Sequence, residues 1–173
     1  MQNNNIILIG MPASGKSTAG VVLAKMLGYA FLDSDLLIQQ STGKLLYQII
    51  NEAGQDSFRA IENEVNASLS CQNTVVATGG SAIYGQEAME HLRQIGTVVY
   101  LQVPFDVLQT RLGPDFNTRG ISMQTGQTLA DLYAERCPLY QKYAHVTVAE
   151  QGEPLAAFAA KIKKAVEDHR KML

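Results

Sequence analysis

The sequence predicts an α/β fold in which a five-stranded parallel sheet carries helices on both faces. Short apolar runs alternate with longer segments of helical periodicity along the 173 residues, and this order is typical of βαβ units. A glycine-rich segment directly follows the first apolar run. Polar or glycine-rich residues also follow the second and third runs. Because ligands of such sheets bind at the carboxyl ends of the strands, these three strand ends predict a site.

The elements follow one another in a regular order. Apolar runs predict strands at 6–9, 29–32, 74–78, 97–101 and 145–148. Helical patterns occupy 17–27, 36–40, 45–69, 86–94, 104–112, 128–143 and 154–171. Gly28 ends the first helix, and breaks are expected near Gly43 and Gly54.

The segment 10–17 reads G-x-x-x-x-G-K-S, which is the pattern of a phosphate-binding loop. Its glycines allow a tight turn in which backbone N–H groups point at phosphate oxygens. Lys16 can reach the β- and γ-phosphates, and the Ser17 hydroxyl can bind Mg²⁺. The pattern therefore predicts ATP and Mg²⁺. The expected nucleotide contacts are Gly10, Ala13, Ser14, Gly15, Lys16, Ser17 and Thr18.

Composition excludes several classes of protein. Hydrophobic residues make up 46% of the chain, as is ordinary for a globular protein. The net charge is −2, so the chain lacks the excess of basic residues that would indicate a nucleic-acid or membrane partner. Neither a membrane-spanning run nor a signal segment is visible in the sequence. Cys71 and Cys137 lack metal-ligand spacing and are expected to be reduced thiols. We expect one domain over residues 1–173, a monomer in the cytoplasm that acts on a small molecule.

The segment 113–127, GPDFNTRGISMQTGQ, interrupts the pattern. A loop of this length in a compact domain is usually a lid, a binding loop or disordered. Beside a phosphate loop we expect a mobile lid, in which Arg119 closes over the transferred phosphate. The alternative is a plain surface insertion.

Acidic and basic side chains provide candidates for phosphoryl transfer. Asp33 and Asp35 are two apart on what reads as an extended stretch, so their side chains would point to opposite sides. One could face the Mg²⁺–phosphate and the other the acceptor, although an acidic residue here can also cap the next helix. Arg59 and Glu62 share a helix face, where a solvated ion pair is the simpler interpretation. Arg136 alone reads as a surface residue, but the planar guanidinium is suited to a carboxylate.

Together these motifs resemble those of the shikimate kinase family over nearly the whole chain. The phosphate loop is followed by FLDSD at 31–35, similar to F-x-D-x-D. Gly54 with Phe58, Arg59 and Glu62 resembles G-x-x-x-F-R-x-x-E. The segment 76–80 is similar to the A-T-G-G-G loop, and 136–144 resembles R-x-P-L-Y…A.

The resemblance implies the fold of the nucleoside monophosphate kinases and transfer of the γ-phosphate of ATP to shikimate. It implies that Asp35 binds the acceptor hydroxyls and accepts the proton. By the same resemblance the substrate is held by Arg59, Arg136, Gly79 and Gly80, Asp33 reaches Mg²⁺, and Arg119 is the lid arginine.

Three positions differ from the family pattern. Ser81 replaces the third glycine, Gly120 replaces the proline after the lid arginine, and Gln39 replaces a glutamate. A kinase of the same fold acting on another hydroxy acid, such as a gluconate-like sugar acid, stays open as an alternative. A nucleoside monophosphate kinase also stays open, whereas a nucleotide switch lacks its N-K-x-D segment.

Overall fold

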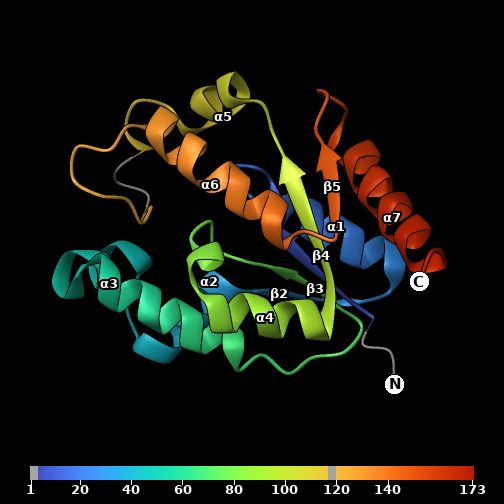
Figure 1. Cartoon of the computed structure of the whole chain (residues 1–173), viewed down its shortest axis with the longest axis horizontal. Helices are drawn as coiled ribbons and strands as arrows, with labels where there is room; N and C mark the ends of the chain where they lie inside the picture. Colours follow the sequence, from blue (N-terminus) through green and yellow to red (C-terminus); the bar gives the residue numbers. More distant parts are fainter. Residues whose placement is uncertain (1–3, 117–119) are drawn as a thin grey trace.

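A computed structural model describes residues 4–116 and 120–173. All strands of this part of the chain form one parallel sheet with the order β2-β3-β1-β4-β5 (Figure 1). The strands are β1 (Asn5–Ile9), β2 (Ala30–Asp33), β3 (Thr74–Ala77), β4 (Gly96–Gln102) and β5 (Val146–Ala149). The predicted fold class is confirmed.

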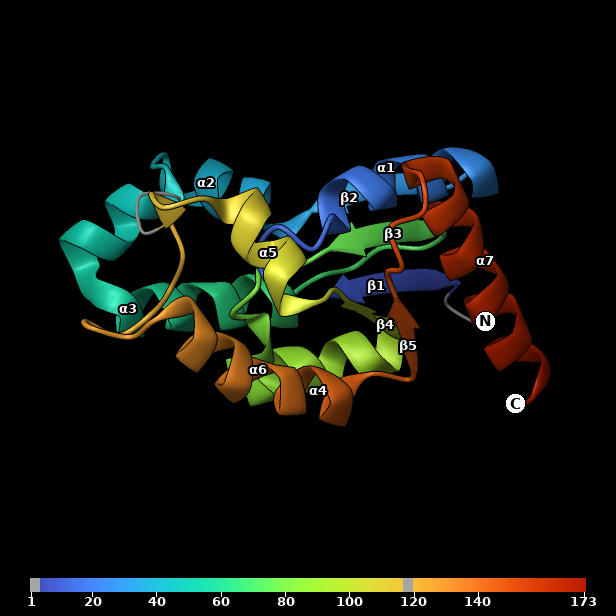
Figure 2. The ribbon, with the colours of Figure 1, turned by 90° about the horizontal axis from the view of Figure 1, so that it is seen from above.

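Helices cover both faces of the sheet (Figure 2). They are α1 (Lys16–Leu27), α2 (Ser34–Thr42), α3 (Leu46–Ala67), α4 (Gln86–Ile95), α5 (Phe105–Leu112), α6 (Leu129–Tyr143) and α7 (Leu155–Lys171). Each predicted helix is found, with boundaries that differ by a few residues at most. The short 3₁₀ turn at Ala82–Tyr84 is an element that the apolar pattern did not indicate.

The core is divided by the sheet into two layers. On one face, alternate side chains of β1 such as Ile6 and Leu8 pack with residues of α1 and α7. On the other face, Ile7 and Ile9 pack with residues of α4 and α6. Strands buried on both faces need continuous apolar runs, which is why β1 carries no alternating pattern.

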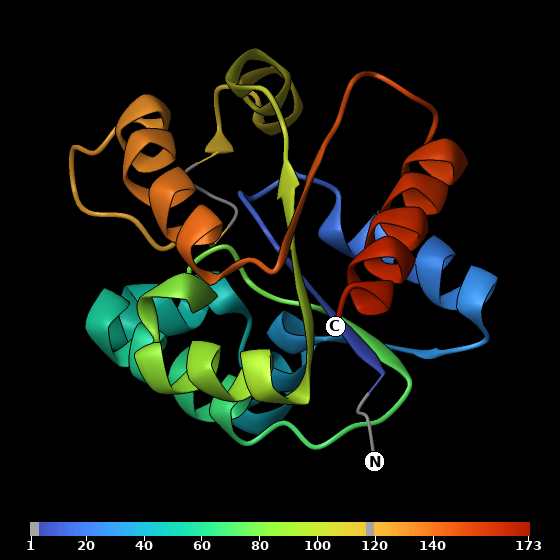
Figure 3. The same ribbon diagram turned by 45° about the vertical axis from the view of Figure 1, so that its right-hand side comes forward.

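The register of the sheet brings three strand ends together. Ala77 of β3 pairs with Leu8 of β1 on one side and with Asp33 of β2 on the other. The segments that follow these strands therefore begin at the same edge. Figure 3 shows the loops at that edge between α1, α3 and α6.

Helix α3 is interrupted as the sequence predicted. Gly54 has a φ of 83° and a ψ of 170°, which break the helical path within Leu46–Ala67. Gly28 and Gly43 follow α1 and α2 in left-handed conformation, as is common after helices. Across the described residues, we find no helix that is both long and apolar enough to span a bilayer.

Candidate active site

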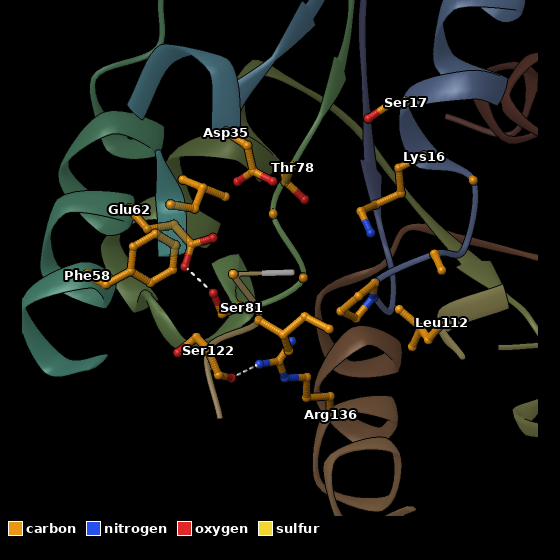
Figure 4. A pocket seen from close by; sticks show the side chains of 18 of the residues that line it. Lys16, Ser17, Asp35, Phe58, Glu62, Thr78, Ser81, Leu112, Ser122 and Arg136 are labelled. Atoms are coloured by element: carbon orange, nitrogen blue, oxygen red, sulfur yellow. Dashed lines mark hydrogen bonds between the residues drawn. The ribbon is translucent and has the colours of Figure 1, made fainter. Parts of the chain in front are cut away.

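A cavity of about 330 Å³ opens at the carboxyl edge of the sheet (Figure 4). It lies between the phosphate loop, the 79–81 loop, α3 and α6. Its lining combines residues far apart in sequence: Pro12, Ala13, Gly15, Lys16, Ser17, Thr18, Asp35, Leu46, Phe58, Glu62, Thr78, Gly79, Gly80, Ser81, Leu112, Gly120, Ile121, Ser122 and Arg136.

The phosphate loop leaves the amino end of α1 open to a ligand. Gly15 is the N-cap with a φ of 85°, and a side chain at Gly10 would lie 2.8 Å from the Leu101 carbonyl oxygen. The first turn of α1 contains no acidic residue, and no side chain of the described residues caps it. Free N–H groups at a helix N-terminus form a binding site for phosphate.

Lys16 lies in the cavity with its charge directed at the loop. Its side-chain ammonium donates hydrogen bonds of 2.8 Å to the carbonyl oxygens of Gly10 and Met11. Burial lowers the pKa of Lys16 to about 8, although Asp35 nearby opposes this shift. A cation held in this way can turn from the carbonyls to an incoming phosphate.

Ser17 and Asp33 form an oxygen-rich pair beside the loop. The Ser17 hydroxyl donates to Asp33 Oδ2 at 2.7 Å, while Asp33 Oδ1 accepts from the Asp35 N–H at 3.0 Å. Asp33 therefore caps α2 with one carboxylate oxygen and contacts the phosphate-loop residue Ser17 with the other. Hydroxyl and carboxylate oxygens suit Mg²⁺. The described residues contain no cluster of three or more His, Cys, Asp or Glu side chains that could hold a metal ion.

Asp35 occupies the first turn of α2, and the expectation of an extended stretch at this residue is wrong. The helix begins early because Asp33 caps it. The two carboxylates still diverge, since Asp35 faces Gly79 whereas Asp33 faces Ser17. Asp35 Oδ1 is buried without a hydrogen-bond partner among the described residues. Burial and the nearby Asp33 raise the pKa of Asp35 to about 6.

Glu62 is a second buried carboxylate that the sequence did not identify as a site residue. It is 1% exposed, and no ion pair with Arg59 is present in the described part, so the interpretation as a solvated pair is wrong. Its Oε2 accepts a hydrogen bond from Ser81, and its Oε1 has no described partner. Burial raises the pKa of Glu62 to about 7.

Arg136 brings a buried positive charge to the opposite wall. It is 1% exposed, so its interpretation as a surface residue is wrong. One guanidinium nitrogen donates to the Ser122 carbonyl oxygen, but Nε has no partner among the described residues. A buried guanidinium whose Nε is free and that forms no ion pair among the described residues is suited to an anionic ligand.

Arg59 is not among the residues that line the cavity. Its Nε donates to the Ser122 hydroxyl at 3.1 Å, and its guanidinium lies 4.0 Å from the centre of the Tyr84 ring. Ser122 thus contacts both arginines. Neither Ser122 nor Tyr84 belongs to a motif, and no local signal could have singled them out.

Gly79 and Gly80 separate the two carboxylates from Arg136. A side chain at Gly79 would collide with Glu62 Oε1 and lie 2.7 Å from Asp35 Oδ1. A side chain at Gly80 would lie 2.9 Å from an Arg136 nitrogen. Close approach, and not a special φ angle, requires glycine at both positions.

We predict that Gly79→Ala lowers the free energy of unfolding by about 1–3 kcal/mol, the usual cost of overpacking. Thermal unfolding followed by circular dichroism measures the change. Ser68→Ala, at the exposed end of α3, serves as the control. An unchanged melting temperature for Gly79→Ala would contradict the packing described above.

A second hollow of about 350 Å³ adjoins the other side of the phosphate loop. Arg111 forms a two-armed ion pair with Glu150 there and donates to the Ala13 carbonyl oxygen at 3.2 Å. Its lining consists of Ala13, Ser14, Gly15, Thr18, Arg111, Glu150, Glu153, Leu155 and Phe158.

The predicted lid is described only in part. Arg119 lies outside the described residues, so its predicted position is not tested. Residues 120–122 line the cavity, and Gly120 has a φ of 68° that proline could not adopt. Gln39 accepts a hydrogen bond from the Leu46 N–H and so connects α2 to α3.

Comparisons with known proteins agree on one family. A family model described as shikimate kinase matches residues 12–167. A shikimate kinase of Nitrosomonas europaea is 41% identical over 162 residues, which cover 91% of this chain and 76% of that protein. The structure of shikimate kinase from Acinetobacter baumannii in complex with shikimate superposes with a TM-score of 0.87 at 36% identity, covering 96% of this chain and 94% of that one.

A gluconokinase structure from Sinorhizobium meliloti is more distant. It matches with a TM-score of 0.51 at 19% identity and covers 99% of this chain and 98% of that one. Similarity at this level extends to the fold alone.

Proposed function

This chain belongs to the shikimate kinase family, and we propose that its cavity transfers the γ-phosphate of ATP to a hydroxyl group of shikimate. One observation carries the assignment of roles. Two carboxylates, each with one oxygen that has no described partner, and one buried arginine whose Nε has none lie on opposite sides of the 79–80 backbone, next to the phosphate loop. Hydroxyls and a carboxylate on one small molecule would match these groups.

The donor half would be formed by the loop and α1. The N–H groups at the amino end of α1 would hold the β- and γ-phosphates, and Lys16 would neutralise charge that builds up during transfer. Ser17 and Asp33 would hold Mg²⁺, which supplies further positive charge at the phosphates. The adenosine would occupy the hollow beside Arg111, since it adjoins the same loop.

The acceptor half would be formed by Asp35, Arg136 and the 79–80 backbone. Asp35 would orient the acceptor hydroxyl and take its proton while the hydroxyl oxygen bonds to the γ-phosphorus and the bond to ADP breaks. Arg59 and Arg136 would hold the substrate carboxylate, and both contact Ser122 at that end of the cavity. Residues 1–173 would form one domain, a monomer in the cytoplasm, in which 113–127 would be a mobile lid and Arg119 the lid arginine.

A coupled assay of ADP release over four acceptors tests the substrate. We expect turnover above the ATPase background with shikimate, and little with quinate, gluconate or AMP. Turnover with gluconate alone would favour the sugar-acid alternative. Turnover with AMP alone would instead indicate a nucleoside monophosphate kinase.

We predict a bell-shaped pH profile of kcat/KM for shikimate when ATP is kept well below its KM, so that the rate reports the free enzyme. Burial raises the pKa values of Asp35 and Glu62 to about 6 and about 7, so acidification protonates both and removes two hydroxyl acceptors. Burial also lowers the pKa of Lys16 to about 8, so its charge is lost above that pH in the free enzyme. The optimum should therefore lie between pH 7 and pH 8. A flat profile from pH 5.5 to 9 would contradict these assignments.

A further inference from the structure

Ser81 holds one oxygen of Glu62 in place. Its side chain is 5% exposed, and its hydroxyl donates to Glu62 Oε2 at 2.5 Å (Figure 4). The family pattern has glycine at this position, which offers no hydroxyl. The hydrogen bond is therefore a feature of this chain's own sequence.

The other oxygen of Glu62 is directed at the same place as Asp35. Glu62 Oε1 and Asp35 Oδ1 would both contact a side chain built at Gly79, and neither has a described partner. Both residues line the cavity. Two buried carboxylate oxygens, which can each accept a hydrogen bond, thus lie beside Gly79, and no described donor contacts either of them.

Among the described residues, Arg59 forms no ion pair with Glu62, although the two residues are three apart on α3. Its guanidinium is engaged by the Ser122 hydroxyl and the Tyr84 ring. The charged groups that affect the pKa of Glu62 are Asp35 on α2, Arg136 on α6 and Arg59 on α3. Glu62 in turn contributes to the pKa of Lys16 on α1. Ser81 is the residue of the described chain that hydrogen-bonds the Glu62 carboxylate.

We propose that Ser81 is a positioning residue that fixes Glu62 so that its free oxygen and that of Asp35 bind two different hydroxyls of one polyhydroxy acid. This inference rests on the proposed function and specifies how the acceptor is chosen. An acid with a single hydroxyl would leave one buried carboxylate oxygen unpaired, which is costly. The site would therefore bind most tightly an acceptor that carries two hydroxyls at the end of the molecule remote from its carboxylate.

Ser81→Ala tests the inference. We expect the KM for shikimate and its Kd in calorimetric titration to rise about fivefold to tenfold, the scale of the net contribution of one intramolecular hydrogen bond. The KM for ATP should stay within about twofold, and the acid limb of the pH profile should move to higher pH, since the ionised carboxylate has lost a donor. Ser81→Thr keeps the hydroxyl and should restore most of the affinity. Ser68→Ala, which alters an exposed serine, should change none of these values.

A double-mutant cycle separates action through Glu62 from general damage. In a Glu62→Gln background, Ser81→Ala should add little to the loss of shikimate affinity. Equal effects of Ser81→Ala in both backgrounds, or an equal loss of ATP and shikimate binding, would overturn the inference. If the unmutated enzyme binds and phosphorylates shikimate but the Ser81→Ala variant binds shikimate with the same affinity, this inference alone is overturned. Failure of the unmutated enzyme to use shikimate would instead overturn the proposed function.

Discussion

Lys16→Ala should lower kcat by on the order of a thousandfold, which corresponds to about 4 kcal/mol of transition-state stabilisation. Lys16 is the cation at the phosphate loop, and its ammonium already lies over the loop carbonyls. Alanine would leave the charge that develops on the transferred group without this partner. Steady-state kinetics with saturating shikimate and ATP measure the change.

Lys25→Ala provides a matched control for this prediction. Lys25 lies in the last turn of α1, so the same helix loses a lysine away from the cavity. Its kcat should stay near that of the unmutated enzyme. A Lys16→Ala variant with normal turnover would mean that the phosphate loop does not bind the transferred phosphate.

Arg136→Ala should raise the KM for shikimate about 30- to 150-fold, the equivalent of about 2–3 kcal/mol for a hydrogen bond to a charged group. The KM for ATP should change by less than about twofold, because Arg136 lies on the acceptor side of Gly80. Arg136→Lys should give an intermediate loss, since an ammonium cannot bind both carboxylate oxygens through a planar fork.

Lys142→Ala, which alters an exposed cation of α6, should leave both KM values unchanged. If Arg136→Ala weakened the binding of ATP and the binding of shikimate equally, Arg136 would not be the group that binds the substrate carboxylate. Melting temperatures of the variants should accompany the kinetics, because Arg136 also donates to Ser122.

Elements and motifs with local causes could be predicted from the sequence. Gly28 ends α1 because its left-handed conformation lets its N–H donate to the Ala24 carbonyl oxygen at the end of the helix. The turn of the phosphate loop depends on the glycines of the G-x-x-x-x-G-K-S pattern itself. Apolar runs marked all five strands. The order of those strands depends on contacts between distant segments, and no local pattern specified it.

The acceptor side depends on such distant contacts. An arginine and a glutamate three residues apart have the same spacing whether they are exposed or buried. Glu62 is buried because the 79–81 loop covers it, and Ser81 is 19 residues further along the chain. Arg136 is fixed by the Ser122 carbonyl, which belongs to no motif. Asp35 was misplaced for a different reason, because the capping bond from Asp33 starts α2 two residues before the apolar pattern does.

Phosphorus NMR of a reaction with ATP and shikimate detects the phosphorylated acceptor itself. We expect a new phosphate monoester signal that grows at the rate at which ADP appears, together with loss of the γ-phosphate signal of ATP. Omitting shikimate should abolish the new signal. ADP formation accompanied only by inorganic phosphate would contradict the claim that this cavity transfers phosphate to shikimate.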